Sequence, residues 1–331
     1  MIHNNTLSLK EISWARIIAT ILIVGGHSFS FYTGGWAISS ACPIPVYGWF
    51  STFFTAIGLA VFTYISGYLY AWLYFYQGKY TDRRAFVAQK IRRILVPFFI
   101  WAVLQALLLP QYYPLSGIVD GAGHLWFLPM LFLVFIVADL LRPLWSKASI
   151  GGWLTIIASA VVLFMLTRYL RSLHIFLPTS LKQLFYYLPT FLFGMMTARM
   201  GQHLDRYLPV AASIAGLVLS AAMTLTCVVF EIKIGLNMVF CMIFSMLLVG
   251  LFRQTNLTLN SAARSINKCS MGIYILHHIL IWYFIRFDSV HELLDDLGYA
   301  GPMLIFVTVF SLSWLLTSLC FRLKIAKYLF G

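Results

Sequence analysis

The first apolar stretch of the sequence carries two ionisable residues, Arg16 and His27, eleven positions apart. Eleven residues of α-helix make about three turns, so both side chains lie on one face, about 16 Å apart along the axis. Ionisable groups inside an apolar span are costly unless they face a polar interior, which makes both residues functional candidates. Histidine exchanges a proton near neutral pH, so we predict His27 as a general base. The alternative is a packing role, with His27 hydrogen-bonded to a neighbouring helix.

Further histidines stand in two other apolar segments, His124 in GHLWFL and His277 with His278 in SMGIYILHH. His277 lies about two turns into its segment, too deep to reach water easily. Asp139 is the one acidic residue well inside an apolar stretch, so we predict no metal site. The sequence also lacks a GxSxG nucleophile elbow and the glycine-rich loops that bind nucleotides.

A basic run occupies residues 78–97, GKYTDRRAFVAQKIRRILVP. Its cations are Lys79, Arg83, Arg84, Lys90, Arg92 and Arg93. The later part is typical of an amphipathic helix that continues into an apolar span. Two interpretations are open, a collar that binds lipid headgroups and a seat for a phosphorylated cytosolic donor.

The composition identifies the solvent in which these residues must work. Of 331 residues, 61% are hydrophobic and 10% are charged, and the mean hydropathy is +0.87. A water-soluble enzyme is excluded, because so few polar residues cannot cover a globule of this size, whereas lipid solvates apolar faces directly. We therefore predict an all-α, polytopic integral membrane protein.

About ten apolar stretches are long enough to cross a bilayer as helices. They are centred near 13–32, 49–76, 91–109, 124–141, 151–168, 184–200, 210–229, 234–252, 271–286 and 301–321. No linker or internal repeat divides them, so a single domain over 1–331 is predicted. The start, MIHNNTLSLKEISWARI, does not resemble a cleavable signal, and the first stretch is expected to remain as an anchor. Five scattered cysteines are interpreted as small buried hydrophobes.

The charges give the orientation. Alternating the loops between two sides places most of the 23 basic residues on one side and most of the ten acidic residues on the other. The positive-inside rule makes the basic side cytoplasmic, and both termini fall on it. Topology explains most of the net charge of +13, so no nucleic-acid partner is predicted.

Five motifs in this order resemble the acyltransferase-3 family of bacterial membrane acyltransferases. They are Arg16 with His27, VFTYISGYLYAW with Ser66 and Tyr68, KIRRILVP with Arg93 and Pro97, HLWFL at 124–128, and SMGIYILHH at 270–278. The resemblance covers nearly the whole chain. Members transfer an acyl group, usually acetyl, from cytosolic acyl-CoA to extracytoplasmic sugars. No SGNH-type domain is expected beside the membrane domain, and the chain is similar to the stand-alone O-acetyltransferases of surface polysaccharides such as enterobacterial common antigen.

The resemblance implies a role for each candidate. His27 is expected to be the general base, with a covalent acetyl-histidine as a variant. Acetyl-CoA, the one cofactor expected, would be held by Arg16, Lys90, Arg92 and Arg93. Ser66, Tyr68, His124, Trp126, Tyr274 and His277 are expected to line the substrate site or channel. Ser66, Tyr68 and Tyr274 are also candidate donors to an oxyanion.

The expected partners are acetyl-CoA, a surface glycan or lipid-linked saccharide, and membrane lipids, in the bacterial inner membrane. The aromatic residues of segment 32–54, Trp36 among them, would stack a sugar or form an interfacial belt. A homo-oligomer is an open alternative. The main functional alternative is a transporter or flippase without acyl-transfer chemistry, and a non-catalytic scaffold or receptor is the third class.

Overall fold

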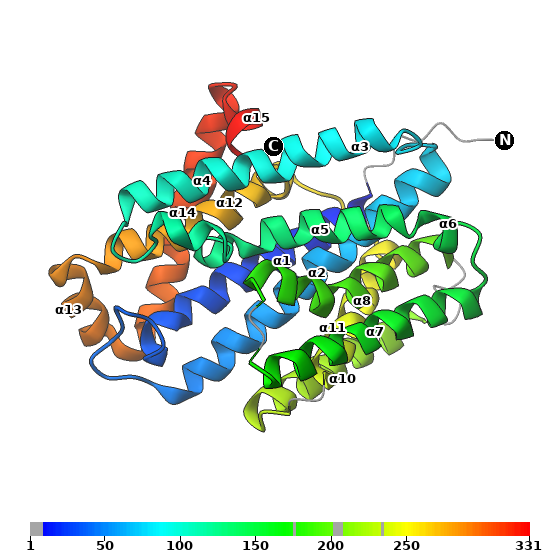
Figure 1. The fold of residues 1–331 in the computed structure, drawn as a ribbon. Helices are drawn as coiled ribbons and strands as arrows, with labels where there is room; N and C mark the ends of the chain where they lie inside the picture. The colour runs from blue at the N-terminus through cyan, green and yellow to red at the C-terminus, as the bar shows by residue number, and fades with distance from the viewer. Residues whose placement is uncertain (1–8, 175–176, 201–207, 233–234) are drawn as a thin grey trace.

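A computed structural model describes residues 9–174, 177–200, 208–232 and 235–331 as an all-helical bundle, without strands in these ranges (Figure 1). Residues 1–8 belong to the N-terminal segment for which no cleavable signal is expected, and they lie outside the described part. The long helices are α1 (Lys10–Ser30), α2 (Pro45–Gln77), α4 (Val96–Leu108), α5 (Phe127–Leu140), α7 (Ile150–Ser172), α8 (Thr179–Met200), α10 (Val210–Val229), α11 (Leu236–Gln254), α12 (Ser261–Ile285) and α14 (Gly301–Arg322).

Shorter elements connect or extend these helices. They are η1 (Phe31–Thr33), α3 (Arg83–Lys90), the π-helical turn η2 (Ile91–Leu95), η3 (Leu115–Ile118), η4 (Gly123–Trp126), α6 (Arg142–Trp145), α13 (Asp288–Leu297), η5 (Gly298–Ala300) and α15 (Ala326–Leu329). In Figure 1, α3 and α4 form one long rod, and α15 lies beside it. The amphipathic continuation predicted for the basic run is therefore present as α3, η2 and α4.

Within the described residues, nine helical segments are long and apolar enough to cross a membrane. The chain is thus a multi-pass membrane protein, as the composition predicts. The tenth expected span, 184–200, corresponds to α8, which is of similar length but is not one of the nine. Most of α8 from Tyr187 to Ala198 is buried among other helices. A helix shielded from lipid needs no continuous apolar surface, which explains its lower hydropathy.

Close packing of α8 on α2 depends on two glycines. A side chain at Gly67 of α2 would collide with the backbone of Phe191, and one at Gly194 of α8 would collide with the backbone of Tyr64. The Tyr64 hydroxyl also lies 2.6 Å from the Thr197 hydroxyl. Small residues that let two backbones approach are the usual basis of helix association in lipid.

Contacts between α1 and α12 show that the two helices run parallel. Arg16 Nη1 donates to Asn267 Oδ1 at 3.4 Å. About three turns further toward the C-terminus of both helices, His27 contacts His277. Helices that run in the same direction must be separated by an odd number of crossings. The seven intervening long rods include α8, so the register of α1 on α12 requires α8 to cross the bundle as well.

The two ends of the bundle differ in charge. One end, which we call the basic end, carries Lys10, Arg83, Arg142, Arg199 and Arg322, at the starts or ends of their helices. The opposite loop end carries Asp120 and the acidic helix α13, whose Asp295 accepts a 2.5 Å hydrogen bond from Ser40. The positive-inside rule assigns the basic end to the cytoplasm.

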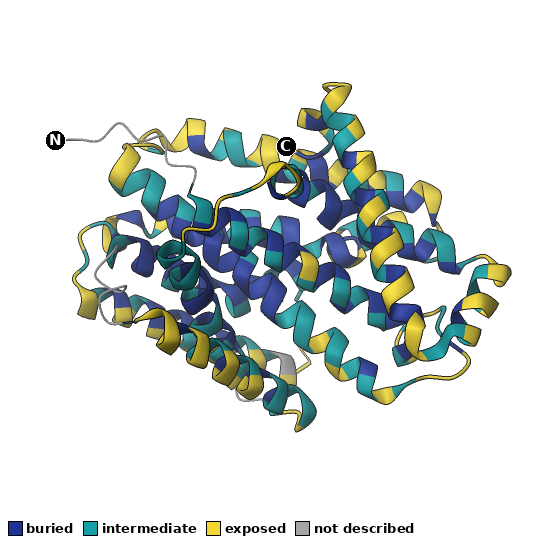
Figure 2. Ribbon diagram, turned by 180° about the vertical axis from the view of Figure 1, so that it is seen from behind, coloured by how far each residue is buried: buried dark blue, intermediate teal, exposed yellow. Residues whose placement is uncertain are grey.

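The burial pattern fits a protein solvated by lipid. Figure 2 shows buried residues concentrated in the central helices and exposed ones on the outer helices. Exposed residues on α7, α10 and α14 include Val162, Val218 and Leu315, each at least 64% exposed. Cys227, Cys241 and Cys269 are buried as predicted, Cys320 is half-buried, and Cys42 is exposed because it lies in the loop before α2.

Candidate active site

A cavity of about 580 Å³ opens between α1, α2, α12 and η4, on the loop-end side of Arg16. Three histidines from three elements line it, His27, His124 and His278. Hydroxyl side chains of α1 and α2 form another part of the wall, namely Ser30, Ser51, Thr52 and Thr55. The cavity therefore combines proton-exchanging groups with hydroxyl donors in one site.

His27 and His277 form a directed hydrogen-bonded pair. His277 Nδ1 lies 3.0 Å from the Ile273 carbonyl oxygen, which can only accept, so Nδ1 carries the proton and Nε2 is an acceptor in the neutral ring. His27 Nδ1 lies 3.1 Å from the Ile23 carbonyl oxygen and 3.0 Å from His277 Nε2. It must therefore be the donor to both, which leaves His27 Nε2 as a lone-pair nitrogen. Among the described residues, no group hydrogen-bonds this nitrogen, and His27 lines the cavity.

His277 supports His27 from behind. It is fully buried on α12 and is not part of the cavity wall. The pair locks both the tautomer and the ring orientation of His27, as the partner of a catalytic histidine does in hydrolase triads. The structure thus brings His27 and His277 together, but places only His27 against the cavity.

His124 is held at the cavity by the backbone of α12. Its Nε2 donates to the Ile275 carbonyl oxygen at 3.0 Å, and the Tyr274 hydroxyl donates to the His124 carbonyl oxygen at 2.5 Å. The preceding Gly123 has a φ of +62°, and a side chain there would collide with the ring of Tyr113. Tyr274 is therefore placed behind His124, where it fixes the backbone and does not line the cavity.

His278 was not selected from the sequence as a site residue, yet it lines the cavity where His277 does not. Its ring stacks on His124 with 4.3 Å between centroids, and its Nδ1 lies 3.3 Å from the Tyr113 hydroxyl oxygen. Burial raises the pKa of Tyr113, so its hydroxyl stays protonated at neutral pH. The adjacent pair HH was the available signal, since on a helix neighbours point about 100° apart and only one of them can face away from the cavity.

Two loops place aromatic rings beside the cavity, around Trp282 of its wall. Trp36, from the loop after η1, stacks on Trp282 of α12 at 5.1 Å, and Tyr112, from the loop after α4, contacts the same ring at 4.7 Å. Ser40 is tied to Asp295, which anchors the first loop on α13. In the described part of the chain, the histidine cluster has no arrangement of ligands suited to a metal ion.

The remaining residues predicted for the substrate site lie outside the cavity wall. Ser66 donates to the Phe62 carbonyl oxygen within its own helix at 2.8 Å. Tyr68 is buried, and its ring centroid lies 6.4 Å from that of Tyr64. Trp126 stacks on Tyr187, which does line the cavity. These three side chains are packed around the site without reaching it.

The cations predicted to hold the donor are separated from the cavity. Arg16 is hydrogen-bonded to Asn267 and lies eleven residues before His27 on α1, which is about three helical turns. Lys90 Nζ sits over the ring of Phe135, 3.5 Å from its centroid, with Tyr80 and Phe86 beside it. None of the four cations lines the cavity.

Arg92 and Arg93 are exposed on η2, the π-helical turn at the junction of α3 and α4. Such turns displace side chains from the regular α-helical positions and recur at functional sites. The chain segment after α14 packs here, since a side chain at Gly331 would collide with the backbone of Arg93 and Trp101 Nε1 donates to the Leu329 carbonyl oxygen at 2.8 Å.

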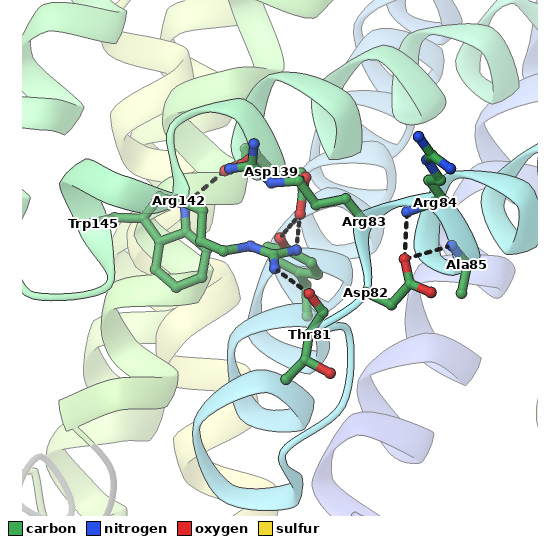
Figure 3. A network of polar contacts seen from close by, with 10 residues as sticks. Thr81, Asp82, Arg83, Arg84, Ala85, Asp139, Arg142 and Trp145 are labelled. Carbon is green, nitrogen blue, oxygen red and sulfur yellow. Dashed lines mark hydrogen bonds and ion pairs between the residues drawn. The ribbon is translucent and has the colours of Figure 1, made fainter.

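A buried ionic network fastens the basic run to the bundle (Figure 3). The Asp139 carboxylate on α5 receives the Arg142 guanidinium, the Tyr70 hydroxyl at 3.0 Å and Arg83 Nε at 3.4 Å. Arg142 also donates to the Thr81 carbonyl oxygen. Next to it, Asp82 caps α3 by accepting the backbone N–H groups of Arg84 and Ala85. The network fixes where the cation run leaves the membrane.

We expect Asp139→Leu to lower the free energy of unfolding by about 3 kcal/mol, because it leaves the buried Arg142 guanidinium without its carboxylate. The double variant Asp139→Leu with Arg142→Met should recover most of this loss, since no buried charge is then left uncompensated. Thermal unfolding in detergent measures both. A double variant that melts no higher than the single one would show that the network is not the cause.

Comparison with known protein families identifies a family for this chain. The family model of the acyltransferase domain, Acyl_transf_3, covers residues 9–322, from the start of α1 to the end of α14. Comparison with curated proteins and with solved structures gives no match. The matched range contains the histidine cavity, the basic run and the ionic network. The chain belongs to the acyltransferase-3 family and is a membrane acyltransferase.

Proposed function

We propose that this acyltransferase moves an acetyl group from cytosolic acetyl-CoA to a hydroxyl of an extracytoplasmic glycan or lipid-linked saccharide, in the bacterial inner membrane. The observation that carries the proposal is His27 itself, a residue of the cavity wall whose Nδ1 is fixed by Ile23 and His277 and whose Nε2 has no hydrogen-bond partner among the described residues. A neutral imidazole held in this way is suited to accept a proton from an attacking hydroxyl.

In the proposed reaction His27 acts first as a base and then as an acid. Its Nε2 takes the proton of the acceptor hydroxyl as that oxygen attacks the thioester carbonyl carbon. The C–S bond of the tetrahedral intermediate then breaks, and the leaving CoA sulfur takes the proton from Nε2. The products are an acetyl ester and free CoA, and His27 returns to its starting state. The hydroxyls of Ser51, Thr52 and Thr55 in the cavity wall are available to the oxyanion.

The donor would enter from the basic end. The phosphates of CoA are anions that remain outside lipid, and Arg92 and Arg93 are exposed where such an anion would arrive. Arg16 marks the route inward, since it lies eleven residues before His27 on α1, about 16 Å along the axis. The pantetheine arm would cover this distance along the seam between α1 and α12. The lipid-headgroup interpretation of the basic run predicts no such preference for CoA.

We expect Arg93→Gln to weaken the binding of CoA about tenfold or more, because a charge-assisted hydrogen bond contributes roughly 1.5–3 kcal/mol. Calorimetric titration of the purified protein with CoA measures the effect. Arg84→Gln is the matched control, since Arg84 is an exposed cation of the same run but lies on α3, about two turns before Arg93. Equal affinities for wild type and Arg93→Gln would remove Arg93 from the donor site.

The experiment that tests the proposal is release of free CoA. Purified protein is mixed with acetyl-CoA and a bacterial glycolipid extract, and the new thiol is measured against the same mixture without protein. We expect thiol release that requires both the extract and His27. Absence of acetyl-CoA binding and of thiol release in the wild type would contradict the proposed donor and favour a transporter.

A further inference from the structure

A second polar groove lies at the basic end of the bundle, remote from the histidine cavity. It has a volume of about 410 Å³ and lies between the start of α12 and the end of α14. Volumes of this size are typical of sites that hold a small molecule or a headgroup. Lys268 of α12 and Arg322 of α14 stand on its rim, and Ser265, Ser318 and Trp314 line its interior.

The floor of the groove is tied together by polar contacts between the two helices. Trp314 Nε1 donates to Ser265 Oγ at 3.0 Å, and the buried Cys269 Sγ lies 3.4 Å from Ser318 Oγ. These contacts hold the two walls at a constant separation. A ligand that enters the groove therefore meets a surface that is already formed.

The two cations of the rim have no anionic partner. Neither Lys268 nor Arg322 forms an ion pair with a carboxylate in the ranges that the structure describes. Lys268 Nζ rests instead over the ring of Phe321, 4.3 Å from its centroid, which keeps the ammonium at the groove. Two carboxylates of the same end are committed elsewhere, Asp139 in the ionic network and Asp82 at the cap of α3. Two positive charges are thus held together without compensation.

The groove continues into an apolar, outward-facing surface. Leu315, which lines it, is 64% exposed, and Leu319, one turn further along α14, is 48% exposed. A free inorganic anion would use the cations alone and leave this surface unused. A molecule with an anionic head and acyl chains matches both parts.

We propose that this groove binds one anionic phospholipid of the cytoplasmic leaflet. The phosphodiester would bridge Lys268 and Arg322, with Ser265 and Ser318 within the groove as hydroxyl donors, and an acyl chain would lie along the exposed leucines of α14. Juxtamembrane cations attract anionic lipids by about 1 kcal/mol each, and two cations fixed on neighbouring helices act on the same phosphate. The bound lipid would join α12, which carries His277 and His278, to α14. This inference does not depend on acetyl-CoA as donor.

Native mass spectrometry of the full chain, released from detergent micelles, tests the proposal. The probes are phosphatidylglycerol, phosphatidylcholine, glycerophosphoglycerol, which is the same headgroup without acyl chains, and inorganic phosphate. We expect one phosphatidylglycerol to remain bound at concentrations where the other three do not. Lys268→Gln with Arg322→Gln should weaken its binding roughly 30-fold, the effect of two cations at about 1 kcal/mol each.

The matched control is Lys147→Gln with Lys327→Gln, which removes the same charge from two exposed cations that lie outside both the groove and the basic run. It should bind phosphatidylglycerol as the wild type does. The single variants Lys268→Gln and Arg322→Gln, each with an intermediate loss, keep the test valid if the double variant fails to fold. Equal affinity in the groove variants and the control would overturn the proposal. Binding of inorganic phosphate or glycerophosphoglycerol as tight as that of the lipid would show that the occupant is a soluble anion, which also overturns it.

Discussion

His27→Gln should lower the rate of acetyl transfer by about 10²–10⁴-fold, the contribution of a positioned general base. Glutamine has a similar reach but cannot take a proton from the acceptor hydroxyl. Because His27 touches no cation of the basic run, the variant should bind CoA as the wild type does. Initial rates of label transfer from acetyl-CoA and calorimetric titration with CoA separate the two effects.

His174→Gln is the control for loss of an imidazole, since His174 is exposed in the loop after α7. It should transfer acetyl at the wild-type rate. A His27→Gln protein that folds, binds CoA and still transfers acetyl within threefold of the wild type would exclude His27 as the base. Such a result would restore the packing interpretation of this residue.

Removal of the His277 acceptor should be the next most damaging change, with His277→Phe lowering kcat about 10²-fold. Phenylalanine fills the buried space but leaves His27 Nδ1–H with the Ile23 carbonyl of its own helix and no acceptor on α12, so the ring is no longer fixed against α12. A misplaced base loses rate of this order. The KM for acetyl-CoA should stay unchanged, because the donor cations contact neither residue. Steady-state kinetics over a range of acetyl-CoA concentrations measures both constants.

His277→Gln separates positioning from packing. Its amide oxygen can accept from His27 Nδ1–H, so most of the lost rate should return, while the fit of the side chain is poorer than that of phenylalanine. If the buried residue acts only through packing, the order would be reversed, with His277→Phe close to wild type and His277→Gln impaired.

The helices could be predicted because apolar length is a local property of the chain. α8 was the instructive case, since it was expected from its apolar run yet is less apolar than the nine other spans. Its close contacts with α2 through Gly67 and Gly194 keep it out of lipid. Hydropathy measures exposure to lipid, and a helix at the centre of a bundle is partly released from that requirement.

The site was predictable only where one helix determines it. The spacing of Arg16 and His27 places both on one face of α1, and the structure shows both against α12. The assignment of His277 behind His27, and of His278 to the cavity, depends on how α12 is rotated against α1. Rotation is a tertiary property that the sequence of α12 alone does not specify.

The same limitation explains Ser66 and Tyr68. Both lie in a motif of α2 whose order in the chain resembles the family, but the face of α2 that lines the cavity carries Ser51, Thr52 and Thr55 instead. These three residues lie within about one turn of α2, and single hydroxyl residues in an apolar helix do not show which face meets a cavity when no neighbouring helix is known. The loop residue Trp36 was noted as aromatic, but its stacking on Trp282 joins segments far apart in the chain.

The most direct test of the account is vectorial transfer in proteoliposomes. The vesicles enclose a bacterial glycan extract, acetyl-CoA with a labelled acetyl group is supplied outside, and only molecules with the basic end outward are competent. We predict labelled glycan in the lumen, formed without labelled acetyl-CoA inside, and absent with His27→Gln. The contradicting result is a glycan that stays unlabelled while intact acetyl-CoA or a saccharide crosses the membrane. The protein would then transport a solute and would not transfer an acyl group.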